Sequence, residues 1–184
     1  MFKKRKWPKK PQTESEDETP RELNPEKARS KTFDRAVNLL TYKARSIREL
    51  RERLLEKQWT NEQIVDEVIE KLKFYGYLND ETFAKNLASS KIRQKPMGKR
   101  LLQQKLSLKK LDKETVENAL EKAFAETPED ELIDQAIAKR LRLKGKPQDR
   151  DEAKKFYDYL LRQGFSYDLV SSKMRELAKL EEEI

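Results

Sequence analysis

An internal repeat of apolar residues constrains this fold more than any other feature of the sequence. Three anchor leucines, Leu54, Leu106 and Leu160, stand 52 and 54 residues apart. Each has an apolar residue four positions before it and others five, ten and fourteen positions after it, with no gap inside the unit. Six positions after the anchors stand residues of helix-capping type, namely Thr60, Asp112 and Ser166. A repeated pattern indicates a repeated structural unit, so we predict three copies of one small fold.

The spacing within the unit predicts two helices joined by a short turn. Apolar residues four positions apart lie on one helix face, and the apolar residue five positions after the anchor suits the Schellman turn that ends the first helix. Thr60 with Gln63 predicts a capping box for the second helix. The residue between the helices favours Gly for its left-handed backbone. Gly164 suits that position, whereas Gln58 and Lys110 depart from it at a cost of about 1 kcal/mol each.

A third helix is expected before each pair, at about 34–43, 81–93 and 129–143. Between the first two units, Gly76 predicts a second Schellman turn, with Tyr77 packing on Leu72 and Asp80 capping the next helix. The predicted fold is all-α, with three tandem three-helix repeats that form a curved, elongated helical solenoid. Expected boundaries are 33–79, 80–127 and 128–184, after a charged tail at 1–32 whose few large apolar residues predict disorder.

The composition excludes several classes of protein. The 184 residues include no Cys and no His, which excludes zinc fingers, disulfide frameworks and Ser-His or Cys-His catalytic pairs. No GxxxxGK[ST] or GxGxxG loop is present to hold a nucleotide, so we expect no cofactor. No apolar run is long enough for a membrane span, and the start lacks the apolar stretch of a signal peptide. We therefore expect a soluble, cytoplasmic protein that does not contact a membrane.

The charges are distributed unevenly along the chain. Residues 85–111 carry nine Lys or Arg and no Asp or Glu, 112–138 carry nine acidic residues and two basic ones, and 139–146 carry five basic residues. Basic stripes of this kind are how proteins bind a polyanion, although a solvated helix face is the alternative explanation. The candidate nucleic-acid or filament-binding residues are Arg45, Arg48, Arg93, Lys95, Lys99, Arg100, Lys139, Arg140, Arg142 and Lys144.

Two other groups of residues are weaker candidates for a site. The acidic residues at 126, 129, 130, 131 and 134 lie at a predicted helix start after Pro128, which favours helix capping over a Mg²⁺ site. We therefore predict no metal site. The aromatic residues at 59, 74, 77 and 165 are assigned to packing, with base stacking as the minor alternative.

Three strings of the sequence resemble the RecX regulatory protein family in their order and spacing. They are YKARSIRELRERLLEKQW, IEKLKFYGYLNDETFAKNLA and MGKRLLQQKLSLKKLDKETVENAL. The matching residues are Arg45, Ser46, Glu49, Leu50 and Leu54, then Gly76, Tyr77, Leu78, Asn79, Asp80, Phe83 and Ala84, then Gly98, Leu102 and Leu106. Departures from the family are Gln58 and Lys110, where Gly is usual, and the charged N-terminal tail.

This resemblance implies a non-enzymatic modulator of the RecA recombinase, active in DNA repair, homologous recombination and the SOS response. Such a protein is expected to act as a monomer in the groove of the RecA filament on single-stranded DNA. There it would inhibit ATP hydrolysis, strand exchange and coprotease activity, with double-stranded DNA as a further candidate ligand. The main alternative is a stand-alone helical DNA-binding protein that uses the basic stripes alone. A metal-dependent nuclease is a third class and would need carboxylates that face one point.

Overall fold

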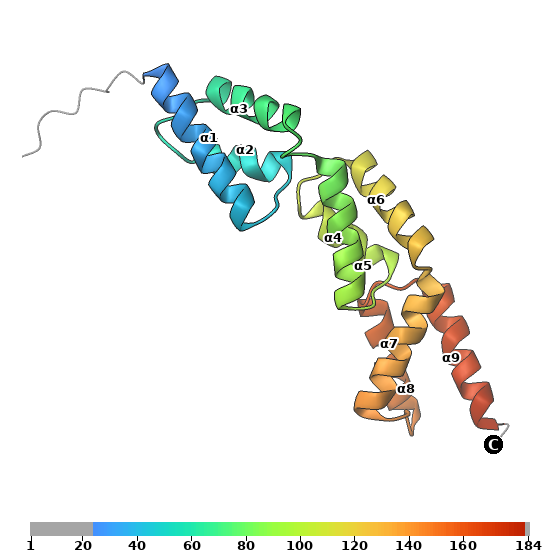
Figure 1. The fold of residues 1–184 in the computed structure, drawn as a ribbon. Helices are drawn as coiled ribbons and strands as arrows, with labels where there is room; N and C mark the ends of the chain where they lie inside the picture. The colour runs from blue at the N-terminus through green and yellow to red at the C-terminus, as the bar shows by residue number, and fades with distance from the viewer. Residues whose placement is uncertain (1–23, 183–184) are drawn as a thin grey trace, which may run out of the picture.

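The computed structural model describes the backbone of residues 24–182 and the side chains up to residue 178, and this part of the chain is all-helical. The helices follow one another along an elongated molecule, from α1 at one end to α9 at the other (Figure 1). They are α1 (Pro25–Tyr42), α2 (Ile47–Leu55), α3 (Glu62–Phe74), α4 (Asp80–Gln94), α5 (Lys99–Ser107), α6 (Lys113–Glu126), α7 (Glu129–Lys144), α8 (Arg150–Arg162) and α9 (Tyr167–Glu182). We call α1–α3, α4–α6 and α7–α9 units 1, 2 and 3.

The repeat predicted from the anchor leucines is confirmed. Leu54, Leu106 and Leu160 are all buried, each on the second helix of its unit. The apolar residues one turn before them are buried as well, and these are Leu50, Leu102 and Phe156. Every unit therefore uses the same face of its second helix to build the core, as the four-residue spacing requires.

The predicted caps of the third helix are correct in units 2 and 3. Asp112 precedes α6 and accepts the Thr115 N–H at 2.8 Å. Ser166 precedes α9 and accepts the Leu169 N–H at 3.3 Å. Lys110 has a φ of 57° and Gly164 a φ of 89°, so the predicted left-handed residue is present in both turns. Lys110 is the one non-glycine residue with a positive φ between residues 24 and 182.

In unit 1 the predicted cap is wrong by one residue. The N-cap of α3 is Asn61, whose side chain accepts the Ile64 N–H at 2.9 Å. Thr60 instead accepts a hydrogen bond from the buried hydroxyl of Thr32 at 3.0 Å, and Gln63 donates to Glu67. The predicted capping box between Thr60 and Gln63 is therefore absent from the described chain.

A longer turn explains the difference in unit 1. The Val65 N–H bonds the Asn61 carbonyl just as the Val116 N–H bonds the Asp112 carbonyl, so Val65 is the structural counterpart of Val116. An ungapped alignment of the units gives that role to Ile64. The extra residue lets the turn close without a left-handed residue, and Gln58 lacks the positive φ that the alignment predicts.

The turn after α3 confirms one prediction and corrects two others. Gly76 has a φ of 72°, and the Tyr77 N–H bonds the Leu72 carbonyl at 2.9 Å, as in a Schellman motif. The Tyr77 side chain nevertheless is 68% exposed and that of Phe74 is 86% exposed, so their predicted packing roles are wrong. Asp80 is not the cap of α4, because Asn79 takes that place and accepts the Thr82 N–H at 2.8 Å.

The first helix begins earlier than expected. It starts at Pro25, a residue that suits the first turn, and the Asn24 side chain accepts the backbone N–H of Glu26. Ala28 and Thr32 are buried in unit 1. The sequence predicts disorder for residues 25–32 because that segment has few large apolar residues, yet small side chains suffice for this packing. The remainder of the predicted tail, at 1–23, lies outside the described residues.

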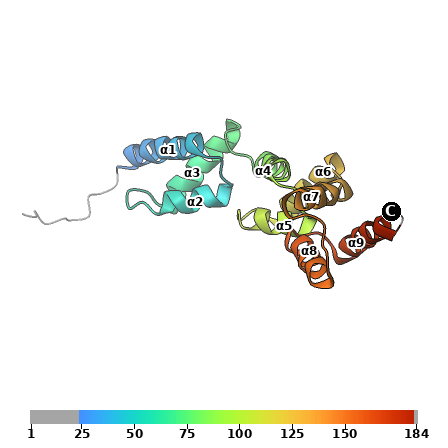
Figure 2. The same ribbon diagram turned by 90° about the horizontal axis from the view of Figure 1, so that it is seen from below.

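The buried side chains form two separate cores. One lies within unit 1 around Leu50, Leu54 and Leu72. The other extends without interruption through units 2 and 3, from Ala84 to Val170. Viewed from below, α1–α3 lie at one side of the molecule and the remaining helices at the other (Figure 2). Apolar packing thus joins units 2 and 3, whereas unit 1 depends on other contacts.

Both junctions between units use equivalent positions of the repeat. The Ser46 hydroxyl, at the start of α2, donates to the Lys109 carbonyl at 2.6 Å. The Gly98 N–H, at the start of α5, donates to the Gln163 carbonyl at 2.9 Å. Ser46 and Gly98 are 52 residues apart and Lys109 and Gln163 are 54 apart, which are the spacings of the anchors. In each case the start of a unit's second helix contacts the loop between the second and third helices of the following unit.

A carboxylate from the next unit also completes each junction. The first N–H of α2, on Ile47, donates to Asp80 at the start of α4 at 2.8 Å. The first N–H of α5, on Lys99, donates to Glu129 at the start of α7 at 2.8 Å. Helix N-termini leave such N–H groups without partners inside the helix, so each unit satisfies an orphan donor of the one before it.

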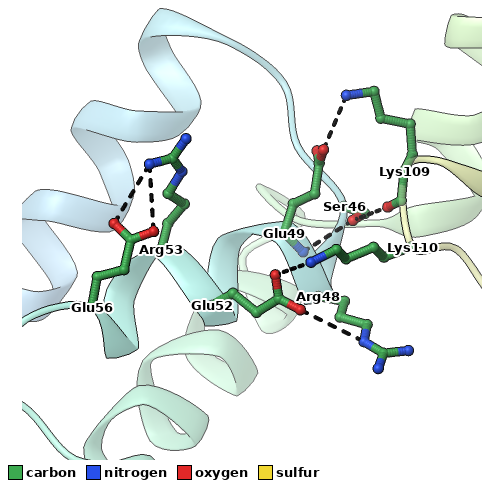
Figure 3. Close-up of polar contacts among 8 residues, drawn as sticks. All are labelled: Ser46, Arg48, Glu49, Glu52, Arg53, Glu56, Lys109 and Lys110. Carbon is green, nitrogen blue, oxygen red and sulfur yellow. Dashed lines mark hydrogen bonds and ion pairs between the residues drawn. The ribbon is translucent and has the colours of Figure 1, made fainter.

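The two junctions differ in what surrounds these shared contacts. Between units 2 and 3 a Cβ added to Gly98 would overlap the Gly164 carbonyl group, so the two backbones touch directly. Between units 1 and 2 ion pairs take that place. Lys109 binds Glu49 at 3.0 Å and Lys110 binds Glu52, as Figure 3 shows. The first junction is therefore polar and the second is closely packed.

The Gly98 contact predicts a steric cost without backbone strain, since Gly98 itself has a φ of −79°. Gly98→Ala should lower the free energy of unfolding by about 1 to 3 kcal/mol, because a methyl group enters a space filled by backbone. Urea unfolding followed by circular dichroism measures this. The exposed neighbour Lys99→Ala is the control and should change stability by less than about 0.5 kcal/mol. Equal effects of the two substitutions would contradict direct backbone contact.

The junction between units 1 and 2 predicts a dependence of stability on pH. Burial, followed by repulsion from Asp112 and Glu49, raises the pKa of Asp80 above 3.8, although its bond to Ile47 opposes the shift. The ionised carboxylate therefore costs stability above the raised pKa, and this cost is relieved as pH falls through it. Asp80→Asn should be more stable than the wild type at pH 7, and the gain should shrink toward pH 4.

Asp112→Asn is the matched control for that experiment. Its hydrogen bonds with Thr115 lower the pKa of Asp112, so its contribution to stability is present above the unfolded pKa and is lost as pH falls through the lowered one. Asp112→Asn should thus have a lower free energy of unfolding than the wild type at pH 7, and this difference should become smaller at acidic pH. Chemical unfolding at both pH values distinguishes the variants. Effects of the same sign would contradict the assignment of Asp80.

Candidate nucleic-acid interface

Four of the predicted site residues lie around the turn between α4 and α5, at the end of α4, in the turn and at the start of α5. Arg93, Lys95, Lys99 and Arg100 are all exposed there. None forms an ion pair with the described side chains of residues 24–178. Met97, within the turn, is buried, and Gly98 is fixed against unit 3. This turn thus presents four cations that form no ion pair with the described side chains, although the Glu129 carboxylate binds the Lys99 backbone N–H beside them.

Other members of the predicted stripe at 85–111 are used inside the molecule. Lys109 and Lys110 bind the carboxylates of Glu49 and Glu52 at the first junction. Lys85 lies 3.4 Å from Glu126. The acid-free run of sequence therefore does not form one continuous basic surface, because the acidic partners come from other helices. Sequence alone could not reveal this division, since it depends on how the units are joined.

A second group of cations lies at the end of α7. Lys139, Arg142 and Lys144 are exposed, and Arg142 and Lys144 occupy the last turn, where positive charge complements the helix dipole. Arg140 is half-buried, with its guanidinium carbon 4.6 Å from the centre of the Tyr159 ring. This contact holds the Arg140 side chain against α8.

A hollow of about 160 Å³ lies beside Arg140, between the end of α7 and α8. Lys144, Lys146 and Lys155 line it with Arg140, and the one carboxylate present, Glu152, accepts the Gln148 N–H at 2.8 Å. Such a hollow suits a phosphate group, which two lysines absent from the predicted set would help to bind. A search for basic runs finds Lys146 but not Lys155, which comes from a different helix.

Arg45 and Arg48 lie apart from these cations. Arg48 is exposed and its Nε is 3.9 Å from Glu52, which Lys110 also binds. Arg45 is half-buried beside the first junction, in a groove that α4 also lines. The structure therefore does not bring these two residues together with the turn at Arg93–Arg100.

The acidic residues near the start of α7 are engaged with donors from other helices. Glu126 binds Lys85, Glu129 accepts the Lys99 N–H, and Asp134 lies 2.9 Å from the Lys173 ammonium. The hydrogen bond to Asp134 raises the pKa of Lys173. Within the described residues no group of three or more carboxylates has the arrangement of a metal site. No helix in that part of the chain is long and apolar enough to cross a membrane.

Family comparison identifies the three units. Models of the RecX first, second and third three-helix domains match residues 33–72, 79–120 and 127–174. Regulatory protein RecX of Bacillus velezensis is 34% identical over 149 residues, which cover 79% of this chain and 55% of that protein. The RecX protein of Finegoldia magna is 32% identical over 139 residues, covering 75% of this chain and 67% of that protein.

A solved structure supports the same relationship. The crystal structure of RecX from Lactobacillus salivarius superposes with a TM-score of 0.72 at 25% identity, covering 83% of this chain and 98% of that one. The chain spans about half the length of the Bacillus relatives that it matches. With three family domains in order along one all-helical repeat, this chain belongs to the RecX regulatory protein family.

Proposed function

We propose that this protein regulates the RecA recombinase by binding the RecA filament on single-stranded DNA. It acts by binding and not by catalysis, as a monomer, and it inhibits RecA ATP hydrolysis, strand exchange and coprotease activity. Membership of the RecX family supports this proposal, as do the names of relatives as regulatory proteins. An elongated repeat protein (Figure 1) also suits a filament, because stacked repeats offer an extended surface to an elongated partner.

The observation that carries the proposal is the exposed positive charge on units 2 and 3. The turn at Arg93–Arg100 and the end of α7 both present more cations than carboxylates, and the two units share one core. Their spacing is therefore fixed before binding, which reduces the entropic cost of binding an extended polyanion. We assign the DNA phosphates of the filament to Arg93, Lys95, Lys99, Arg100, Lys139, Arg140, Arg142 and Lys144.

A stand-alone DNA-binding protein is the second candidate, and the same basic residues favour it. The two functions differ in what the protein prefers to bind. A filament regulator binds the RecA–DNA complex more strongly than bare DNA, and double-stranded DNA is then a weaker ligand held by the same phosphate contacts. A DNA-binding protein without a RecA contact binds bare DNA and the filament with equal strength.

Single-stranded-DNA-dependent ATP hydrolysis by RecA tests the proposed function directly. The protein should reduce the rate at well below one molecule per RecA subunit, because a ligand that prefers one filament state shifts growth or turnover of the whole polymer. Unchanged hydrolysis at a stoichiometric ratio would overturn the proposal. Inhibition that excess bare DNA abolishes fully would favour the DNA-binding alternative.

Charge reversal tests the assignment of the turn between α4 and α5. Replacing Arg93, Lys95, Lys99 and Arg100 together by Glu should weaken binding to single-stranded DNA and to the filament. The slope of log affinity against log salt should flatten by about 0.7 for each phosphate that the variant no longer neutralises. Fluorescence anisotropy at a series of salt concentrations measures both quantities.

The control reverses four exposed lysines from different parts of the chain, Lys27, Lys113, Lys122 and Lys154. It changes the net charge by the same amount, so it separates a local contact from general attraction. The control should keep a salt slope closer to that of the wild type. If both sets flatten the slope equally, the turn makes no specific phosphate contact.

A further inference from the structure

The ends of α1 and α3 carry an exposed aromatic patch that the proposed DNA contacts do not explain. Eight large apolar side chains are exposed in the described part of the chain, and four of them are here: Val37, Phe74, Tyr75 and Tyr77. The rings of Phe74 and Tyr75 lie 5.6 Å apart, and those of Tyr75 and Tyr77 lie 6.2 Å apart. Exposed patches of this kind mark binding surfaces in soluble proteins.

Two adjoining hollows lie beside this patch. The first, of about 620 Å³, lies between α1 and the end of α3, with Phe33, Val37 and Leu72 among its walls. The second, of about 350 Å³, lies at the junction of units 1 and 2 and contains Arg45. Leu40 and Tyr77 line both hollows, so the two form one continuous surface. We call it the unit 1 groove.

The walls of the first hollow decide what chemistry it accepts. They are aliphatic or aromatic carbon, apart from the Thr41 hydroxyl and the tyrosine hydroxyls, and no cation lines them. A nucleobase placed there would bury polar edges without hydrogen-bond partners, which costs free energy. An apolar side chain loses nothing polar on entry and gains from leaving water. The hollow therefore favours a protein side chain over a base.

The second hollow is more polar than the first and is partly lined by hydrogen-bond donors. The Arg45 Nε is buried and has no acceptor among the described residues, and Arg45 forms no ion pair with the described side chains. Lys73 also lines this hollow, although it pairs with Glu70 at 2.8 Å. The Asn79 side-chain oxygen caps α4, which leaves its NH₂ group free to donate. The Arg45 side chain lines the hollow, where a carboxylate would give its guanidinium an oxygen acceptor of opposite charge.

We propose that the unit 1 groove binds a protein segment that carries an apolar side chain followed closely by an Asp or Glu. The apolar side chain enters the first hollow beside Tyr75 and Tyr77, and the carboxylate accepts from Arg45 in the second. This inference rests on the proposed function, because it assigns the protein contact within the RecA filament to unit 1 and leaves the DNA phosphates to units 2 and 3. Arg45 is thereby removed from the predicted nucleic-acid set.

The test uses the full chain and two groove variants, Tyr75→Ser with Tyr77→Ser, and Arg45→Gln. Binding is measured to RecA assembled on single-stranded DNA with a non-hydrolysable ATP analogue, and to fluorescent oligo-dT alone. Each variant should bind the filament about tenfold more weakly or worse, as expected for buried Tyr and Arg contacts, and bind oligo-dT as the wild type does. Tyr167→Ser, an exposed tyrosine of unit 3, and Arg53→Gln, paired with Glu56, are the matched controls and should change neither affinity.

Each other outcome overturns the inference in a distinguishable way. If the wild type binds the filament and both groove variants bind it equally well, the groove is not the protein contact, while the proposed function stands. If the wild type does not prefer the filament to oligo-dT, the proposed function fails and this inference fails with it. A parallel loss of oligo-dT affinity assigns the groove to nucleic acid. A wild-type dimer in sedimentation that the groove variants convert to monomer assigns it to a second copy of the chain.

Discussion

The architecture depends on the satisfaction of helix N-termini across the junctions between units. A helix start that faces another unit must give its free N–H groups to an acceptor, because burying them unpaired is costly. At both junctions a carboxylate of the following unit accepts the first N–H of the helix. At the second junction the Gln163 carbonyl also accepts the Gly98 N–H, whereas at the first the Lys109 carbonyl accepts the Ser46 hydroxyl. The same geometry that ends one unit therefore sets where the next one lies. Because the sequence repeat places the same contacts at both junctions, each unit is attached to the next in a similar way, and the molecule is elongated.

One position within this scheme separates the two junctions. Gly98 brings the backbones of units 2 and 3 into direct contact, whereas its counterpart Ser46 reaches across with a hydroxyl group. The added distance in the first junction leaves room for the ion pairs of Lys109 and Lys110. These lysines belong to the basic run of sequence but neutralise carboxylates of unit 1. Part of the basic run that the sequence suggests for ligand binding is thus used in ion pairs between units 1 and 2.

Sequence reasoning predicted the elements whose cause is local. The buried anchors, the left-handed residue at Lys110 and the caps at Asp112 and Ser166 follow from spacings within a few residues. It failed where a single insertion shifted the register, at Thr60 and Asn61, because the neighbouring Ile64 and Val65 are both apolar and both buried. It also failed for Phe74 and Tyr77, since an aromatic side chain at a helix end is covered only if another element passes over it. The four cations at Arg93–Arg100 lie exposed near one turn, and their binding role stays a prediction. The role of Arg45 depends on a groove between units that no local pattern reveals.

The division of the apolar interior into two clusters has a consequence for how the molecule opens. Continuous apolar packing favours cooperative unfolding, so we expect α4–α9 to open as one unit and α1–α3 as another. Amide hydrogens of Leu50 and Leu72 should then exchange with solvent through openings that leave Leu102 and Leu132 protected. A partner that binds only unit 1 can therefore change the position of α1–α3 while the cations of units 2 and 3 keep their relative positions. The protein thus consists of two separately packed parts, α1–α3 and α4–α9, joined by a polar interface.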